Sequence, residues 1–543
     1  MLRQIIIFNA FCVFFAASIH PIYPGPEFKP TKGEVWPKPQ QQKKYNTYFK
    51  LPLNFKFTVT DETCHILKSA IDRYTKVLKN TFHIAWKNSG RMTKSMKFYF
   101  TDYYYNGVLE ELEIALSSPC EEYPNIDMNE RYSINVSTVS TISSSSIWGI
   151  LRGMETFVQL FYIPDDSRNV FINRTEIVDF PRYIHRGLLI DTSRHYISVP
   201  NILKTLDAME MNKMNVFHWH IVDDQSFPYQ SAKFPNLSAQ GAYHSSMVYT
   251  KENISLIVNY ARDRAIRVVP EFDVPGHTIS WGAAYPNILS KCYSNGKVIG
   301  LGPMDPTNNM TYKLIGELFQ EVQERFPDRY FHVGGDEVDM SCWLSNPHIR
   351  AFMTKHNLSS AGQLHRYFMK RIFPMLSKNR KPIVWQEVFD EGAATYADTL
   401  IQVWKSVEPE ELVQILRSGL RVIYSASWYL DHLSSGGDWI DFYTADPRRM
   451  IPKSAHNIDR NNIIGGEACM WGEVVDDRNL MPRVWPRTSA VAEKLWSADQ
   501  YLNYFYLSPP NEVYHRIEEH ACRMVRRGVD AQPPNGPGFC LSN

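Results

Sequence analysis

The stretch Tyr330-Phe-His-Val-Gly-Gly-Asp-Glu337 is a short apolar run that ends in two glycines and two carboxylates. It is one of eight such runs after Tyr183, most of them followed by a segment with apolar residues at helical spacing. The eight runs are 187–190, 216–222, 266–272, 330–333, 382–385, 400–404, 422–424 and 463–468. Eight alternating β and α units favour an α/β fold, a (β/α)8 TIM barrel over residues 181–543. A doubly wound sheet is the alternative, although no GxGxxG motif follows a strand.

The chain before the barrel divides into three parts. Residues 1–18 carry an apolar run followed by Ala16, Ala17 and Ser18, a pattern typical of a signal peptide. Residues 19–46 are rich in proline and predict an extended lead-in with little regular structure. Residues 47–180 mix β-like runs at 55–60, 96–101 and 132–136 with helical patterns at 63–78 and 146–160, which predicts a smaller α+β domain.

Composition narrows the classes of partner. The 58 Lys and Arg residues balance 57 Asp and Glu residues, which argues against a nucleic-acid partner and favours a neutral or mixed small substrate. No apolar run reaches the roughly 20 residues of a membrane span. Asn-x-Ser/Thr sequons fit a chain that passes through the secretory pathway, and the glycosylation candidates are Asn135, Asn173, Asn236, Asn253, Asn309 and Asn357.

Seven of the eight cysteines follow the signal segment, so one thiol is expected to stay free in an oxidising compartment. Proximity along the chain suggests the disulfides Cys64–Cys120, Cys292–Cys342 and Cys522–Cys540, with Cys469 as a buried thiol. The sequence alone leaves this connectivity open. Because the chain has neither a CxxC pair nor an HExxH motif, no metal and no cofactor are expected.

The adjacent carboxylates Asp336 and Glu337 are the strongest catalytic candidates. One ionised carboxylate disfavours ionisation of its neighbour, so such a pair suits a proton donor and its electrostatic partner. Glycosidic cleavage needs this proton donor, because the leaving oxygen departs poorly until it is protonated. The alternative is a solvated surface pair. The position of Asp336 and Glu337 after an apolar strand and two glycines favours the catalytic interpretation.

Other side chains at the predicted strand ends suggest a sugar pocket. Trp385, Trp404 and Trp471 follow three different strands and would wall one pocket, with ordinary core packing as the alternative. Arg194 is a candidate hydroxyl-binding donor, or else the partner of Asp191 or Glu467 in a salt bridge. His218 and His220 lie two apart in one strand and face one side. A metal site is possible there, but hydrogen-bonded barrel-interior residues are the favoured interpretation.

Four segments carry a family resemblance. They are His185-Arg-Gly-Leu-Leu-Ile-Asp-Thr-Ser-Arg-His-Tyr196, His218-Trp-His-Ile-Val-Asp-Asp-Gln-Ser-Phe-Pro228, Phe331-His-Val-Gly-Gly-Asp-Glu337 and Gly465-Gly-Glu-Ala-Cys-Met-Trp-Gly-Glu473. With these segments the sequence, over roughly residues 36–540, resembles the β-N-acetylhexosaminidases of glycoside hydrolase family 20, particularly the animal lysosomal enzymes. The resemblance implies a small α/β domain packed on a TIM barrel. It also implies exo-acting, retaining hydrolysis of terminal non-reducing β-linked N-acetylglucosamine or N-acetylgalactosamine from glycoconjugates or chitin oligomers.

The resemblance further implies a substrate-assisted mechanism, in which the 2-acetamido oxygen of the substrate attacks the anomeric carbon and forms an oxazolinium intermediate. Glu337 resembles the general acid and base, and Asp336 the residue that orients and stabilises the acetamido group. Tyr429 resembles the hydrogen-bond donor to the acetamido oxygen. The remaining matches are Trp385, Trp404 and Trp471 around the sugar, Arg194, Asp431 and Glu473 at its hydroxyls, and Asp223 and His277 in a network supporting Glu337.

The resemblance also bears on partners and alternatives. It implies a homodimer or a dimer with a related subunit, and a lysosomal or secreted protein. His432 lies where related subunits differ, and this difference influences whether negatively charged sugars are accepted. A non-catalytic N-acetylhexosamine-binding protein on the same scaffold is the alternative, and its mark would be loss of Asp336, Glu337 or Tyr429. All three are present. The Asp-x-x-Asp-x-Asp-x-Glu run of an endo-acting chitinase is absent, which favours an exo-acting enzyme.

Overall fold

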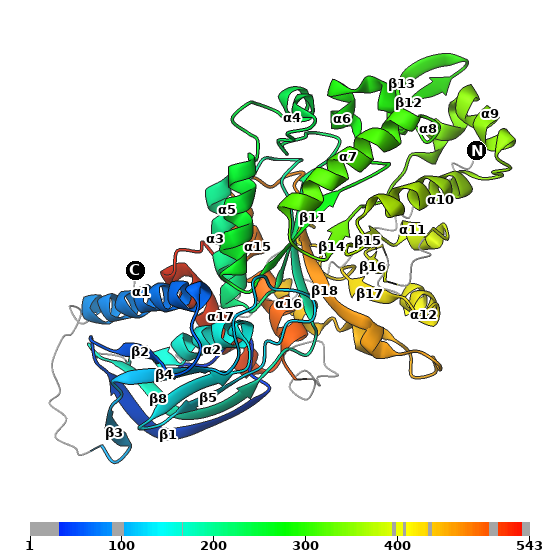
Figure 1. Cartoon of the computed structure of the whole chain (residues 1–543). Helices are drawn as coiled ribbons and strands as arrows, with labels where there is room; N and C mark the ends of the chain where they lie inside the picture. Colours follow the sequence, from blue (N-terminus) through cyan, green and yellow to red (C-terminus); the bar gives the residue numbers. More distant parts are fainter. Residues whose placement is uncertain are drawn as a thin grey trace, which may run out of the picture.

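The structure, a computed structural model, describes residues 32–88, 102–164, 167–393, 398–405, 409–432, 437–498 and 509–534. The predicted signal peptide and the β-like run 96–101 lie outside these residues. The described chain forms a small sheet-containing domain beside a barrel (Figure 1). Within the described ranges, no helix combines the length and the apolar composition needed to cross a membrane.

The small domain is an eight-stranded mixed sheet in the order β2-β4-β6-β5-β8-β1-β3, with β7 paired to β8. Its helices α1 (His65–Asn88) and α2 (Ile147–Gln159) pack on this sheet and against each other. The Ser146 side chain accepts the N–H of Trp148, which starts α2. The strands are β1 Gln41–Leu51, β2 Lys56–Val59, β3 Tyr105–Val108, β4 Glu111–Leu116, β5 Tyr132–Val136, β6 Ser140–Ser144, β7 Phe161–Tyr162 and β8 Val170–Asp179. The α+β domain that the sequence predicts is confirmed.

The lead-in prediction is wrong for its last six residues. Residues 41–46 begin β1, which pairs antiparallel with β8. Most side chains of β1 are exposed or half-buried, so this polar stretch lacks the apolar pattern by which strands are recognised in a sequence. Trp36 is fully buried and donates its indole N–H to Ser489 O at 2.9 Å, which anchors the lead-in to the barrel.

The second domain is a closed barrel of eight parallel strands in the order β10-β11-β14-β15-β16-β17-β18-β9. The strands are β9 His185–Asp191, β10 Val216–Val222, β11 Arg267–Phe272, β14 Tyr330–His332, β15 Lys381–Trp385, β16 Leu400–Val403, β17 Arg421–Tyr424 and β18 Ile463–Met470. Each begins and ends within two residues of a predicted run, so the TIM barrel is confirmed. Between β11 and β14 the chain forms a separate hairpin, β12 (Leu289–Ser294) and β13 (Lys297–Met304).

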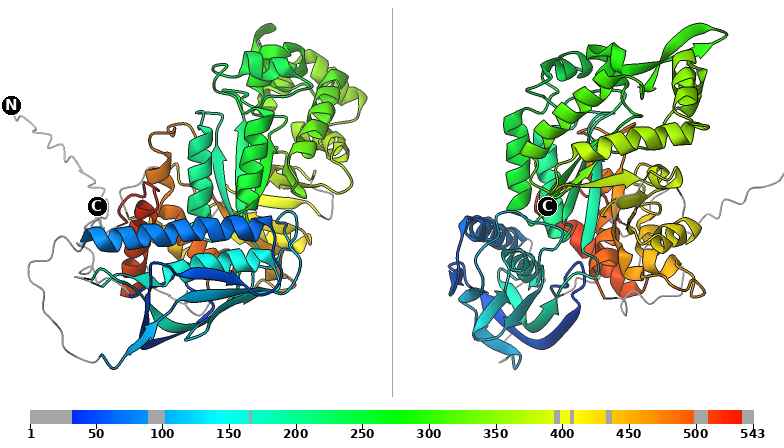
Figure 2. Two further views of the ribbon diagram at one scale, coloured as in Figure 1. Left: turned by 60° about the vertical axis from the view of Figure 1, so that its left-hand side comes forward. Right: turned by 45° about the vertical axis from the view of Figure 1, so that its right-hand side comes forward.

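Helices surround the barrel (Figure 2). Segments with apolar residues at helical spacing after the first three predicted runs become α3 (Val199–Met211), α5 (Lys251–Arg262) and α7 (Asn309–Arg325). The other helices are α4 Pro235–Gly241, α6 Ile279–Ala284, α8 Met340–Ser345, α9 Pro347–Lys355, α10 Ala361–Ile372, α11 Glu387–Asp390, α12 Pro409–Arg417, α13 Trp439–Thr444, α14 Pro447–Met450, α15 Leu480–Val484, α16 Arg487–Trp496 and α17 Asn511–Arg526. Among the described residues, the 3-10 turns are η2 Pro286–Ile288, η3 Phe373–Met375 and η4 Arg460–Asn462.

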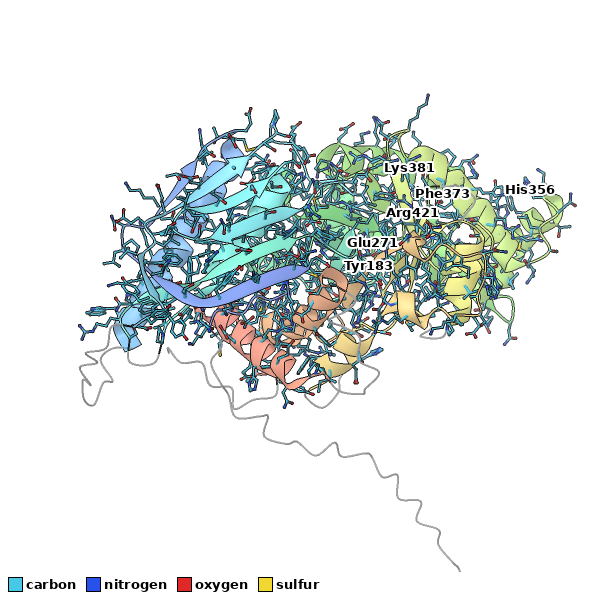
Figure 3. The ribbon with its side chains drawn as sticks, turned by 90° about the horizontal axis from the view of Figure 1, so that it is seen from below. Tyr183, Glu271, His356, Phe373, Lys381 and Arg421 are labelled. Carbon is cyan, nitrogen blue, oxygen red and sulfur yellow. A yellow bond between two sulfur atoms is a disulfide. The ribbon has the colours of Figure 1, made fainter. Side chains whose placement is uncertain are left out.

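The barrel interior is filled in layers, as in other (β/α)8 barrels. Apolar side chains near the strand starts form one cluster, including Val216, Tyr330 and Ile423. A buried layer of histidines and carboxylates lies beyond it, and a third cluster of Leu189, Trp385 and Cys469 follows. Figure 3, seen from below, shows the small-domain sheet beside the barrel, in which Glu271 is labelled. The interior is therefore closed, and a ligand has access at the carboxyl ends of the strands.

Candidate active site

All eleven residues that the sequence singles out as catalytic or substrate-binding line one cavity of about 170 Å³ at the carboxyl ends of the barrel strands. Every strand contributes through its last residue or the loop after it. The lining residues are Arg194, His220, Asp223, His277, Asp336, Glu337, Trp385, Trp404, Tyr429, Asp431, His432, Trp471 and Glu473. His220 and His432 are the two additions to the predicted set.

The loop after β14 presents Asp336 and Glu337. Gly334 and Gly335 have φ values of +68° and +98°, a region that favours glycine. A Cβ at Gly334 would lie 1.8 Å from Asp273 Oδ1, so no other residue fits there. Glu337 itself has φ +46°, and its side chain is 57% exposed, whereas Asp336 is 7% exposed as a residue. The loop therefore directs one carboxylate toward solvent and holds the other against the protein.

Asp273 supports Asp336 from behind. Its Oδ1 accepts the backbone N–H of Gly335 at 2.8 Å. Complete burial, together with the charge of Asp336 and a hydrogen bond to it, raises the pKa of Asp273 well above its usual range. The raised pKa favours the protonated form of Asp273, which can donate a hydrogen bond to Asp336.

His277 and Asp223 stand on the other side of the carboxylate pair. His277 Nδ1 lies 3.1 Å from Asp223 Oδ1, and His277 Nε2 lies 3.6 Å from both Asp336 Oδ2 and Glu337 Oε2. Burial lowers the pKa of His277, but the charge of Asp336 and the hydrogen bond to Asp223 outweigh it and raise this pKa to about 9. Burial also opposes the charge on Asp223, yet hydrogen bonds to His220 and His277 hold the pKa of Asp223 well below its usual range.

Aromatic rings form the wall of the cavity. The Trp385 ring centroid lies 6.3 Å from that of Trp404 and 5.9 Å from that of Trp471. Tyr429 stacks on Trp404 at 6.1 Å, and these rings pack against Leu189 and Cys469. Backbone hydrogen bonds between residues 428–430 and Cys469 hold Tyr429 beside β18. Burial raises the pKa of Tyr429 far above its usual range, so its hydroxyl remains a neutral donor.

The polar rim combines paired and unpaired groups. Arg194 pairs with Asp191 at 2.8 Å and with Asp223 at 2.9 Å, and lies 3.7 Å from Glu473. Of the two salt bridges considered for Arg194, the one with Asp191 forms. Asp431 Oδ1 is buried without a hydrogen-bond partner among the described residues. Burial raises the pKa of Asp431.

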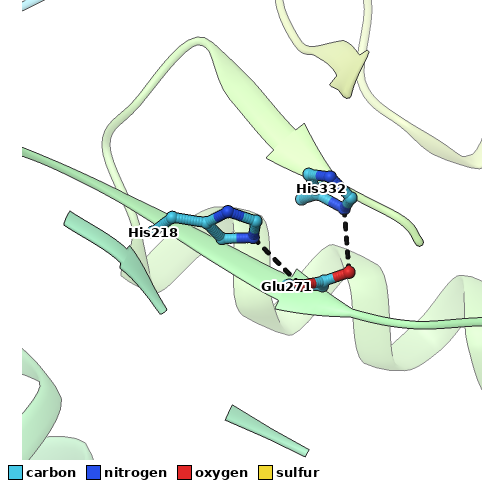
Figure 4. Close-up of side chains that lie close together, drawn as sticks. All are labelled: His218, Glu271 and His332. Atoms are coloured by element: carbon cyan, nitrogen blue, oxygen red, sulfur yellow. Dashed lines mark hydrogen bonds and ion pairs between the residues drawn. The ribbon is translucent and has the colours of Figure 1, made fainter. Parts of the chain in front are cut away.

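Glu467, the other partner considered for Arg194, pairs instead with histidines inside the barrel. Its carboxylate oxygens lie 2.6 Å from His185 Nε2 and 2.8 Å from His218 Nδ1. His218 and His220 are both buried and both contact Glu271, which also lies 3.1 Å from His332 Nδ1 (Figure 4). The prediction that the two histidines are hydrogen-bonded interior residues is confirmed.

Three carboxylates that contact the cavity lining were not assigned a role from the sequence. Asp273, Glu271 and Glu387 occur in the strand-end clusters, but their partners lie on other strands. Glu387, for example, accepts the indole N–H of Trp404 at 3.0 Å. Their position next to predicted strand ends could have marked these carboxylates as candidates. Which groups they contact depends on the register of the barrel strands.

The cysteines largely follow the predicted pairing. The structure contains the disulfides Cys64–Cys120 and Cys292–Cys342, and Cys469 is a buried free thiol. Cys540 of the third predicted pair lies outside the described residues. Among the sequons, Asn173 is 6% exposed and donates its side-chain N–H to Tyr45 O at 2.7 Å, so it is inaccessible as a glycosylation site. The other five remain predictions.

The model of the glycosyl hydrolase family 20 catalytic domain matches residues 183–499, which include the barrel and every residue of this cavity. This chain belongs to glycosyl hydrolase family 20. A second family model, described as beta-acetyl hexosaminidase like, matches residues 35–160 in the small domain. As a member of family 20, the chain is a glycosidase with a (β/α)8 catalytic barrel.

Family 20 relatives resemble the chain along most of its length. The subunit beta of beta-hexosaminidase from Homo sapiens is 47% identical over 435 residues, which cover 79% of this chain and 76% of the human one. The subunit alpha of beta-hexosaminidase from Rattus norvegicus is 40% identical and covers 93% of this chain and 94% of its own. The chitobiase structure from Flavobacterium johnsoniae has a TM-score of 0.76 and 32% identity, and covers 91% of this chain and 73% of that one.

Proposed function

We propose that this glycosidase is an exo-acting β-N-acetylhexosaminidase that removes terminal, non-reducing β-linked N-acetylglucosamine or N-acetylgalactosamine. The observation that carries the proposal is the unequal placement of Asp336 and Glu337 on one loop. Glu337 projects toward solvent at the mouth of a tryptophan-walled cavity, while Asp336 is held inside it. Such a site offers a proton to a leaving oxygen and a fixed negative charge to a group bound within the cavity.

Within this proposal Glu337 protonates the leaving oxygen and afterwards, as a base, activates water. Its exposure leaves room for the aglycone and for that water. His277 Nε2 lies 3.6 Å from Glu337 Oε2, so the imidazolium can follow the change of charge on this carboxylate. Arg194 pairs with Asp223, and Asp223 contacts His277, so Arg194 helps to hold His277 beside Glu337.

The nucleophile in the proposal is the 2-acetamido oxygen of the substrate, and the product of its attack is an oxazolinium. Asp336 accepts the acetamido N–H and offsets the positive charge that develops on the group. The neutral hydroxyl of Tyr429 donates to the acetamido oxygen, and Trp385, Trp404 and Trp471 enclose the acetyl group. An intramolecular nucleophile avoids much of the entropic cost of a second encounter. Asp431, Glu473 and Arg194 bind the sugar hydroxyls.

We further propose that the protein enters the secretory pathway, acts in the lysosome or outside the cell, and forms a dimer with itself or a related subunit. Support comes from the leader pattern, the sequons and the two disulfides. The names of the relatives, which are subunits alpha and beta of beta-hexosaminidase, support the dimer.

The direct test compares the wild-type chain with Glu337→Gln on a chromogenic β-N-acetylglucosaminide. The amide keeps the shape of the side chain and removes its proton transfer. The expected result is a loss of kcat of about 10²-fold or more with little change in KM. Near wild-type turnover by the variant would overturn the role of Glu337. Failure of the wild-type enzyme to release the sugar would overturn the proposed function itself.

A further inference from the structure

Glu271, the next-to-last residue of β11, is fully buried and contacts four side chains from three other strands. Its Oε2 lies 2.6 Å from His220 Nδ1 and 3.0 Å from His218 Nε2. Its Oε1 accepts the indole N–H of Trp385 at 2.7 Å and lies 3.1 Å from His332 Nδ1. One carboxylate oxygen thus faces Trp385 and His332, and the other faces the histidines of β10. Figure 4 shows the contacts of Glu271 with His218 and His332.

A continuous row of groups leads from Glu271 to the proposed acid. His220 Nε2 lies 2.7 Å from Asp223 Oδ2. Asp223 Oδ1 lies 3.1 Å from His277 Nδ1, and His277 Nε2 lies 3.6 Å from Glu337 Oε2. Acidic and basic groups alternate along this row, so the charge of each one supports the ionisation of the next.

We propose that Glu271 is a positioning residue with two effects on the active site, a proposal that rests on the function proposed above. Through His220 it keeps Asp223 charged and aimed at His277. Through the indole N–H it fixes the orientation of Trp385, a wall of the sugar pocket. Glu271 would not touch the substrate.

The electrostatics of the surroundings fit this role. Burial opposes the charge of Glu271, but His332, His220 and His218 hold the pKa of Glu271 well below its usual range. Burial likewise opposes a charge on His220, while Glu271 and Asp223 raise the pKa of His220 well above its usual range. Glu271 and Asp223 therefore both favour the imidazolium of His220, and loss of the charge on Glu271 would weaken this preference.

The charged and titratable groups around Glu271 come from several elements. Besides its four direct contacts, Asp273 lies two residues on and carries a raised pKa because of burial and the charge of Asp336, with Glu271 adding to it. Glu467 approaches from β18 on the far side of His218. Both ring nitrogens of His220 are already occupied, Nδ1 by Glu271 and Nε2 by Asp223. Asp273 and Glu467 therefore cannot replace Glu271 as the close negative partner of His220.

The test compares the pH dependence of kcat/KM for wild type, Glu271→Gln and Glu467→Gln. Glu467 is a matched control, because it is as buried as Glu271 and its partners are His185, His218 and Gln402 rather than His220 or Trp385. Glu271→Gln should move the alkaline limb by about one unit to lower pH, since loss of an adjacent charge lowers the pKa of His220 by about that amount or more. Glu467→Gln should lower the thermal midpoint and leave the limb in place. Equal shifts in both variants, or an unmoved limb in Glu271→Gln, would overturn the proposal.

Two further variants separate the two effects. Glu271→Gln keeps an oxygen that can accept the Trp385 N–H and should leave KM near the wild-type value. Glu271→Ala loses this acceptor and should raise KM several-fold as well. An equal KM for Glu271→Gln and Glu271→Ala would contradict the role assigned to the indole bond.

The path through Asp223 is tested in the Asp223→Asn background, where Glu271→Gln should produce no additional shift of the limb. A full shift in that background would contradict the proposed route. If Glu271→Gln does not fold, His220→Asn interrupts the same row, and an unmoved alkaline limb in that variant would overturn the proposal. Turnover of a β-N-acetylglucosaminide by the wild-type enzyme tests the proposed function alone. The differences in pH profile and KM among the variants test only the role of Glu271.

Discussion

Carboxyl oxygens of Asp273 and Asp336 lie within 4.8 Å of each other and of a ring nitrogen of His277, and Asp273 is fully buried. Two negative charges at this separation in a buried site are unfavourable, so the pair holds one proton. Burial, followed by the charge of Asp336, places that proton on Asp273 by raising its pKa. The charge is then concentrated on the carboxylate that faces the cavity.

This arrangement predicts that Asp273→Asn is nearly silent. An amide reproduces both bonds of a protonated carboxyl, because its oxygen accepts from Gly335 and its N–H donates to Asp336. We expect kcat/KM within about threefold of wild type for Asp273→Asn and a loss of about 10²-fold for Asp273→Ala, comparable to removing one preorganised donor. Steady-state kinetics on a β-N-acetylglucosaminide measure both. Equal losses in the two variants would mean that Asp273 acts as an anion.

The raised pKa values of the buried histidines predict how stability depends on pH. The charges around His277 and His218 outweigh burial and raise the pKa of each to about 9. The ordinary value is about 6.5, so the stabilisation is fully present below that pH and is lost as pH rises through 9. The thermal midpoint should therefore fall between about pH 6.5 and pH 9. His277→Gln should flatten this fall, and a wild-type midpoint that stays constant across the range would contradict the assignment.

His432 predicts a contribution to substrate preference at the rim. Its side chain is 77% exposed and lies 4.0 Å from Asp431, next to the cavity. An imidazole N–H can donate a hydrogen bond to an anionic group, so His432→Ala should lower the kcat/KM for a sulfated substrate more than the kcat/KM for the neutral substrate. The ratio of the two kcat/KM values measures this effect. An unchanged ratio in His432→Ala would mean that His432 does not influence specificity.

Much of the barrel was predictable because its strands are buried on both faces and appear as short apolar runs with polar ends. The strand Ile463–Met470, for example, is buried at every position. The same logic located the site, since catalytic groups in this fold gather at the carboxyl ends of the strands. Strand β1 was missed because it lies in a sheet with one solvated face, and its polar side chains hide it.

The sequence predicts which residues line the site better than it predicts which side chains they contact. Asp273 and Glu271 both lie at the end of β11, yet one supports Asp336 and the other contacts the histidines of β10. Side chains two apart on a strand point to the same face, and the barrel register decides which neighbours they meet. Pairings between different strands are a property of the closed barrel, and no local pattern contains them.

In the proposed mechanism the substrate supplies its own nucleophile, and a substrate without the acetamido group lacks that nucleophile. The kcat/KM of the wild-type enzyme is compared on two aryl glycosides with the same leaving group, a β-N-acetylglucosaminide and a plain β-glucoside. We expect a loss of about 10⁴-fold or more for the glucoside, because in the proposed mechanism no protein carboxylate takes the place of the acetamido group. Hydrolysis of both glycosides at similar rates would contradict it.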